Sequence, residues 1–97
     1  MEERQRKELG QEELLSLRKQ AQHLLPLVRI GKAGLGQNIL LEIVKQLKVH
    51  HLVKIKLLKN FMDDIPMTKR ELADTLTEKT DAFLVSVVGN TVVLYRR

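Results

Sequence analysis

The stretch of residues 28–36 combines a short apolar run, three glycines and a lysine. Glycine lets a backbone approach a partner closely and accepts positive φ angles. The residues that follow have the apolar spacing of a helix, whose first N–H groups are unpaired and carry a partial positive charge. Lys32 lies between the first two glycines. This pattern favours binding of an anion, and in a basic chain we expect that anion to be a phosphate.

The glycine spacing is G-x-x-G-x-G, through Gly31, Gly34 and Gly36. A Walker A loop ends in Gly-Lys-Ser or Gly-Lys-Thr, and neither sequence occurs here. The dinucleotide fingerprint needs G-x-G-x-x-G and an acidic residue about twenty positions later, where this chain is basic. We therefore expect no nucleotide cofactor. A turn that only joins a strand to a helix would use the same glycines, so the spacing alone leaves both interpretations open.

A second feature is a long interval without acidic residues, between Glu42 and Asp63. Its lysines could form a continuous basic surface with Lys32, although ordinary solvated faces also carry runs of lysine. The basic side chains of the interval are Lys45, Lys48, Lys54, Lys56 and Lys59, with His50 and His51.

The overall charge points in the same direction. The formal net charge is +5 and the isoelectric point is about 9.8, which favours a polyanionic partner, nucleic acid first. The aromatic residues are few: Phe61, Phe83 and Tyr95. We therefore expect contacts to the phosphate backbone rather than bases stacked on an aromatic platform.

The groups that could hold a metal or catalyse a reaction are scattered. His50 and His51 are adjacent, so their side chains point apart, and His23 is distant in sequence. The chain has no cysteine to complete a metal set. The remaining candidates are the loop pair Asp63 and Asp64 and the unpaired serines Ser16 and Ser86. We expect no metal, no cofactor and no enzymatic activity.

Apolar spacing predicts the elements that position the glycine loop. A helix begins at Gln11 and ends near Leu24 or Leu25, because the residue before Pro26 avoids helical geometry. Residues 26–30 form a first strand and residues 35–49 a second helix. Residues 52–58 form a second strand, in which Lys54 and Lys56 alternate with apolar side chains. A strand, a helix and a strand in this order predict a parallel pair.

The rest of the chain closes the sheet. Residues 60–66 are expected to be a loop. Thr68 and Glu71 have the spacing of a capping box, so a third helix runs from there to about Lys79. Strands over 81–88 and 91–96 are joined by a two-residue turn, Gly89-Asn90. The order α-β-α-β-α-β-β predicts an α/β fold, a two-layer sandwich with a four-stranded mixed sheet.

Length and composition set the organisation. We expect residues 1–10 to be a polar lead-in and residues 11–97 a single domain. The charged N-terminus lacks the apolar core of a signal peptide, and no apolar run approaches the ~20 residues needed to span a bilayer. We expect a cytoplasmic monomer that does not contact a membrane.

Four motifs in order resemble a known family over residues 13–96. They are the helix exit His23-Leu24-x-Pro26, the loop IGKAGL at 30–35, the strand HLVKIK at 51–56 and the closing VGNTVVLYR at 88–96. The chain resembles the CRM domain, the chloroplast RNA splicing and ribosome maturation module, and its stand-alone YhbY-type members. At Gly36 it departs from the polar or capping residue expected to open the helix.

This resemblance implies a fold like the C-terminal domain of translation initiation factor three, and RNA as the partner. For single-domain members it implies association with precursor large ribosomal subunits. It implies that a G-x-x-G loop contacts the RNA backbone, here Gly31, Lys32, Ala33 and Gly34. The accessory residues that the resemblance suggests are Arg18, Lys19, Lys54 and Lys56. We also expect Arg29, Asn38, Lys45 and Lys48 to contact RNA. The alternative from a different class is an adaptor whose basic sheet face docks an acidic protein.

Overall fold

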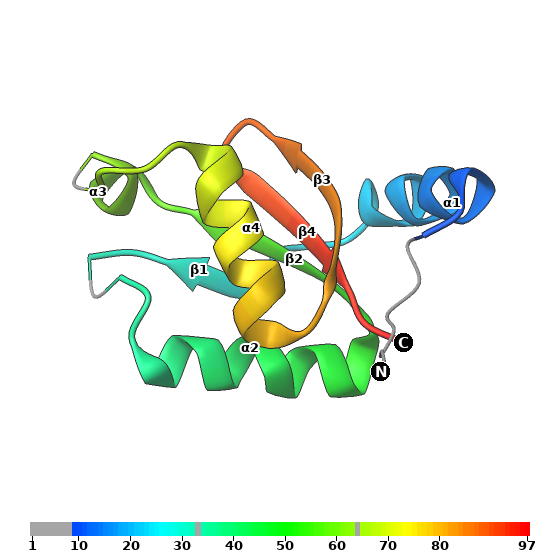
Figure 1. Cartoon of the computed structure of the whole chain (residues 1–97), viewed down its shortest axis with the longest axis horizontal. Coiled ribbons are helices and arrows are strands. Elements are labelled where there is room, and N and C mark those ends of the chain that lie inside the picture. The colour runs from blue at the N-terminus through cyan, green and yellow to red at the C-terminus, as the bar shows by residue number, and fades with distance from the viewer. Residues whose placement is uncertain (1–8, 33, 64) are drawn as a thin grey trace, which may run out of the picture.

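The computed structural model describes residues 9–32, 34–63 and 65–97. Within these ranges, four strands and four helices follow one another (Figure 1). They are α1 (Gln11–Ala21), β1 (Val28–Ile30), α2 (Gln37–His50), β2 (Leu52–Leu57), α3 (Lys59–Met62), α4 (Lys69–Thr80), β3 (Phe83–Val88) and β4 (Thr91–Tyr95). The α/β class is therefore confirmed, with a short helix, α3, added to the predicted order.

The four strands form one mixed sheet in the order β1-β2-β4-β3. β1 and β2 are parallel, with Arg29 beside Lys56 and Ile30 beside Leu57. β4 runs antiparallel to both β2 and β3. The predicted parallel pair and the predicted mixed sheet are both confirmed. Since β1 lies at one edge of the sheet, the loop that follows it leaves the sheet at that edge.

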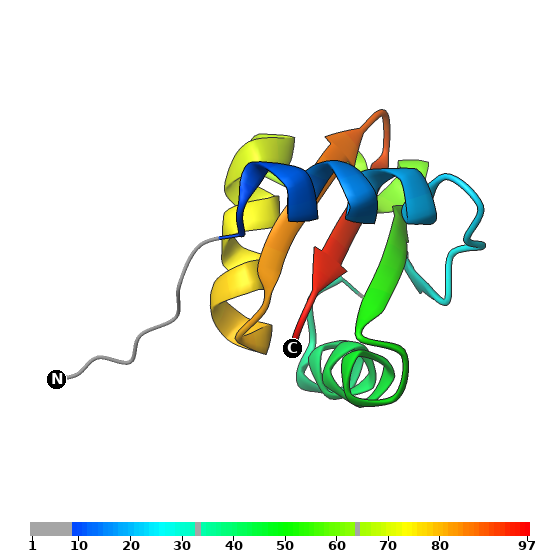
Figure 2. The same ribbon diagram turned by 90° about the vertical axis from the view of Figure 1, so that its right-hand side faces the viewer.

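Helices cover the two faces of the sheet unequally. The larger core lies on the face covered by α2 and α4, where Ile43, Leu47, Leu72 and Leu76 are fully buried. The smaller cluster lies on the other face, under α1, where Leu17 packs with side chains of β2, β3 and β4. Figure 2 shows α1 crossing this second face. The expected sandwich accounts for the α2 and α4 side, and α1 adds a partial layer opposite it.

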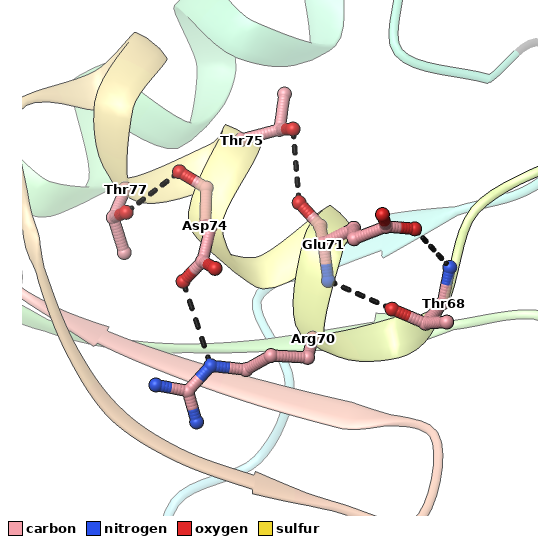
Figure 3. A network of polar contacts seen from close by, with 6 residues as sticks. All are labelled: Thr68, Arg70, Glu71, Asp74, Thr75 and Thr77. Carbon is pink, nitrogen blue, oxygen red and sulfur yellow. Dashed lines mark hydrogen bonds and ion pairs between the residues drawn. The ribbon is translucent and has the colours of Figure 1, made fainter.

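The predicted capping box forms at the start of α4 (Figure 3). The Glu71 backbone N–H donates to Thr68 Oγ1 over 3.1 Å, and the Thr68 N–H donates to Glu71 Oε1 over 2.9 Å. The predicted Gly89-Asn90 turn joins β3 to β4, and Gly89 has a φ of 57° that suits glycine. Local sequence therefore sets these two boundaries.

Several element boundaries differ from the prediction. α1 ends at Ala21 rather than near Leu24, because the chain tightens into i→i+3 hydrogen bonds that end with the Leu24 N–H donating to the Ala21 carbonyl. β1 begins at Val28 rather than Pro26. α2 begins at Gln37 rather than Leu35, because Gly36 keeps an extended conformation at the N-cap.

The predicted loop over residues 60–66 was wrong at its start, where α3 forms. The Phe61 and Met62 N–H groups donate to the Leu58 carbonyl. The Phe61 side chain is buried in the larger core. This anchor draws the chain back toward the sheet after β2, which places α3 near the glycine loop.

Candidate nucleic-acid interface

The glycine loop after β1 is a tight turn fixed at both sides. The Gly34 N–H donates to the Gly31 carbonyl over 2.9 Å, and the Leu58 N–H donates to the Ile30 carbonyl over 2.9 Å. Gly34 has a φ of +73°, which L residues adopt at a cost. A Cβ at Gly31 would lie 3.2 Å from Leu58 Cδ1. Both glycines therefore have a physical reason to be there, and Ala33 lies outside the described residues.

The start of α2 directly follows this turn. The first N–H that donates within the helix belongs to Leu40, which bonds to the Gly36 carbonyl. Gly36 occupies the N-cap position but has no side chain that could accept a hydrogen bond from the helix, and the first turn holds no acidic residue. The preceding N–H groups of the turn, including that of Asn38, therefore have no partner within the helix. The helix start, directly behind the glycine turn, therefore presents backbone donors without a competing carboxylate in its first turn.

A pocket of about 270 Å³ opens beside the loop. The loop and the connection between α3 and α4 both line it, and Figure 1 shows these two segments at the same end of the molecule. The lining residues are Lys32, Gly34, Leu35, Asn60, Phe61, Ile65, Pro66 and Met67. Sequence reasoning missed Asn60 and Met67, and the apolar pair Phe61-Met62 was the available signal that this segment packs against the fold.

Arg29 and Lys56 lie side by side on β1 and β2, and both are exposed. Partners in register project from the same face of a sheet, and here that is the face that carries α1. Lys32 follows two residues beyond the end of β1 and is also exposed. These three cations lie at or near the β1 edge, with the glycine turn.

Arg18 and Lys54 are committed to the scaffold. Arg18 Nε donates to the Val85 carbonyl over 3.0 Å. Lys54 Nζ donates to the Ala21 carbonyl over 3.0 Å and to the Leu24 carbonyl over 3.2 Å. Lys54 thus satisfies carbonyls at the end of α1, where a positive charge is favourable. The structure gives both residues a role in holding α1.

The other predicted contacts are spread over the surface. Lys19 is exposed on α1, whereas Asn38, Lys45 and Lys48 are exposed on α2. α1 and α2 cover opposite faces of the sheet. The predicted basic residues therefore occupy two sides of the molecule, and the glycine loop lies between strand β1 and helix α2.

The α1 side also carries an open groove of about 790 Å³. It runs between α1 and the strands β3 and β4, and its lining includes the cations Arg18, Lys54 and Arg70. Apolar side chains of β3, among them Val85 and Val88, form much of the rest. Two of its three cations already donate to backbone carbonyls, as described above.

The histidines occupy ordinary structural positions. His51 follows α2 with a φ of 67°, and its Nδ1 lies 3.0 Å from the Arg96 carbonyl oxygen. Within the described ranges, no group of three histidine, cysteine, aspartate or glutamate residues is placed to hold a metal ion. In those same ranges no helix has the length and hydropathy to span a bilayer. Asp63 is exposed, and Asp64 lies outside the described residues.

Comparison with known proteins shows which family the chain is similar to. The model of the CRS1 / YhbY (CRM) domain matches residues 9–96. The chain is 35% identical over 80 residues to "Probable RNA-binding protein YqeI" of Bacillus subtilis, which is 82% of this chain and 79% of that protein. It is 36% identical over 96 residues to "Probable RNA-binding protein MJ0652" of Methanocaldococcus jannaschii, which is 99% of this chain and 69% of that protein.

A solved structure shows that the likeness extends to the fold. The hypothetical protein SAV1595 from Staphylococcus aureus, for which RNA binding is suggested, superimposes with a TM-score of 0.74 and 37% identity. The match covers 92% of this chain and 88% of the staphylococcal chain. Family model, curated relatives and structure agree along nearly the whole length. The chain belongs to the CRS1 / YhbY (CRM) domain family.

Proposed function

We propose that this protein binds RNA and that the turn at residues 31–34 holds phosphate groups of the RNA backbone. The observation that carries the proposal is the uncapped start of α2 directly behind that turn. Backbone N–H groups at a helix start favour a phosphate oxygen, because they offer donors and a partial positive charge. Lys32 adds a full charge from within the turn. The names of the curated relatives and the family membership support RNA as the polyanion.

The footprint of the RNA extends from the loop along the β1 edge. Arg29 and Lys56 lie beside each other there, and each adds one exposed cation. Asn38, Lys45 and Lys48 extend it along α2, and Lys19 offers a further charge on α1. If about five phosphates are neutralised, the logarithm of affinity should fall with the logarithm of salt at a slope near −3.5 for a single strand.

The RNA in question is proposed to be ribosomal, as part of a precursor of the large subunit. This part of the proposal rests on the resemblance to stand-alone YhbY-type members. Few contacts to bases are expected from backbone clamping, so RNA shape and assembly partners would supply most of the specificity. A monomer in the cytoplasm is the form in which we expect it to act, without catalysis.

The test is the replacement of Lys32 and Ala33 by aspartate. Two carboxylates in the turn repel phosphate, so we expect most of the RNA affinity to be lost in a titration at fixed salt, while the circular dichroism spectrum is unchanged. Lys32→Ala should lower the magnitude of the salt slope by about 0.7. A control is Lys79→Asp, which changes the charge by −2, compared with −3 for the double loop variant, at an exposed lysine in the last turn of α4. Equal affinities for the doubly substituted loop and the unmodified protein would refute the loop assignment.

A second candidate function is an adaptor for an acidic protein segment. The groove beside α1 favours it, because Arg18, Lys54 and Arg70 line that groove together with apolar side chains of β3. Affinity purification with and without nuclease separates the two functions. A partner retained after complete removal of RNA would support the adaptor, and loss of all partners would support RNA binding.

A further inference from the structure

We propose that the pocket beside the glycine loop receives one unpaired RNA base, whose phosphate is held by the loop. This inference rests on the proposed function and specifies the form of RNA that the site takes. The pocket combines Lys32 and Gly34 of the loop with Asn60, Phe61 and Met67 from the segment after β2. Backbone clamping alone gives no reason for an apolar pocket at this position.

The position of Asn60 ties the pocket to the loop. Its Oδ1 lies 3.7 Å from the place that a Cβ of Gly31 would occupy, so the carboxamide lies over the turn. Among the described residues the Asn60 side chain makes no hydrogen bond, and it is exposed. A carboxamide offers donors and an acceptor together, which matches the mixed donor and acceptor edge of a base.

The floor of the pocket is apolar. Phe61 is 5% exposed, and its Cε1 lies 3.9 Å from the place that a Cβ of Gly34 would occupy. Leu35 and Met67 are partly buried and also line the pocket. Phe61 thus packs beside the turn at Gly34, and the partly buried side chains of Leu35 and Met67 offer the apolar surface that a flat ring would contact. Methionine adapts its shape to such a ring and makes favourable contacts through its sulfur.

The volume of the pocket and the positive charge beside it indicate which ligand it binds. The volume of about 270 Å³ is just below the roughly 300 Å³ at which pockets begin to take drug-sized ligands, so a single base suits it. The cation Lys32 lines the pocket from the loop, so the phosphate attached to that base would bind beside Lys32 and the start of α2. A base inside a duplex cannot enter, because its edge is paired and its faces are stacked. The site therefore selects a loop, bulge or single strand of RNA.

The test compares Asn60→Ala with Gln20→Ala. Gln20 is an exposed amide on α1, and Figure 1 shows α1 at the opposite end of the molecule from the glycine loop. Affinity is measured for a short single-stranded RNA, for an RNA duplex and for inorganic polyphosphate, all at one salt concentration. We expect Asn60→Ala to weaken binding of the single strand by about three- to tenfold, the worth of one neutral hydrogen bond. Binding of the duplex and of polyphosphate should stay unchanged, and Gln20→Ala should change none of the three.

A second pair of variants tests the apolar floor. Met67 lines the pocket and Met62 does not, although both are partly buried against the larger core. We expect Met67→Ala to weaken binding of the single strand by about threefold or more, because the base loses apolar contact, and Met62→Ala to leave it unchanged. Thermal unfolding of both variants shows whether each remains folded at the temperature of the titration.

The outcomes separate this inference from the proposed function. If Lys32→Ala weakens binding of all three probes while Asn60→Ala behaves like Gln20→Ala, RNA binding stands and the base pocket is refuted. If Lys32→Ala changes none of them, the clamp itself is refuted. Equal losses for single strand and polyphosphate in Asn60→Ala would also overturn the pocket, since polyphosphate has no base.

Discussion

The two sides of the molecule use basic residues differently. On the α1 side, Arg18 and Lys54 donate to the backbone carbonyls of Val85, Ala21 and Leu24. At the loop end, the side chain of Lys32 makes no hydrogen bond or ion pair with the described residues and extends from a turn of glycines. The same charge thus holds a helix in one place and is left for a ligand in the other.

A count of lysines in the sequence therefore overestimates the basic surface that is free to bind a ligand. Lys54 and Lys56 are two residues apart on one face of β2, and sequence gives them the same prediction. Only the structure separates them, because the end of α1 lies over Lys54 and not over Lys56. A lysine side chain stays available for RNA where no backbone carbonyl lies within its hydrogen-bonding distance.

The largest expected effect compares Lys54→Met with Lys56→Met. Lys54→Met removes two charge-assisted hydrogen bonds and should lower the free energy of unfolding by about 2 kcal/mol, measured by urea denaturation. Lys56→Met should stay within about 0.5 kcal/mol, yet weaken RNA binding at low salt. The contrast fails if Lys54→Met is as stable as Lys56→Met, or if Lys54→Met alone weakens RNA binding at a temperature where both variants are folded.

A smaller effect compares Gly34→Ala with Gly36→Ala. Gly34 has a positive φ, so alanine should cost about 1–2 kcal/mol of stability there and distort the turn that is proposed to hold phosphate. A Cβ at Gly36 meets open space and Gly36 has an extended backbone, so alanine should leave the turn and RNA binding unchanged and cost only about 0.5–1 kcal/mol, because alanine is a poorer N-cap than glycine. Thermal unfolding and RNA titration on both variants test this. If both variants lowered RNA affinity equally, the positive φ of Gly34 would not be required for RNA binding.

The smallest expected effect compares Gly36→Ser with Gly36→Asp. Both residues can cap α2, and replacing glycine at this position should add a few tenths of a kcal/mol. Aspartate also places a negative charge at the helix start, where the phosphate is proposed to bind. We expect both variants to be at least as stable as the parent and only Gly36→Asp to weaken RNA binding. If Gly36→Asp bound RNA as well as Gly36→Ser, the helix start would be excluded from the site.

Local signals in the sequence predicted most of the fold. The Thr68 and Glu71 pair, the Gly89-Asn90 turn and the alternation through β2 each depend on neighbouring residues, and the structure confirms all three. α3 was missed because its four residues have no pattern of their own. Its buried residue, Phe61, packs in a core built from distant elements.

The candidate site was predictable only in part. The glycine spacing identified the turn, because glycine is the residue type typical of a tight turn with positive φ. The pocket depends on Asn60 and Met67 approaching Gly31 and Gly34 in space. The periodicity of apolar residues in the sequence does not predict such long-range contacts. The bonds of Arg18 and Lys54 are equally non-local, because their acceptors lie 67, 33 and 30 residues away.

The smaller cluster under α1 has a further consequence. α1 contacts the sheet through few buried side chains, and a bidentate ion pair between Arg97 and Glu13, with N–O distances of 3.0 and 3.2 Å, connects it to the end of the chain. Arg97 also lies over the Phe83 ring, 5.2 Å from its centroid. We expect a helix held in this way to open at a lower free energy than the whole domain. Transient opening of α1 would expose the second face of the sheet while the larger core, and the glycine turn fixed to it, stay folded.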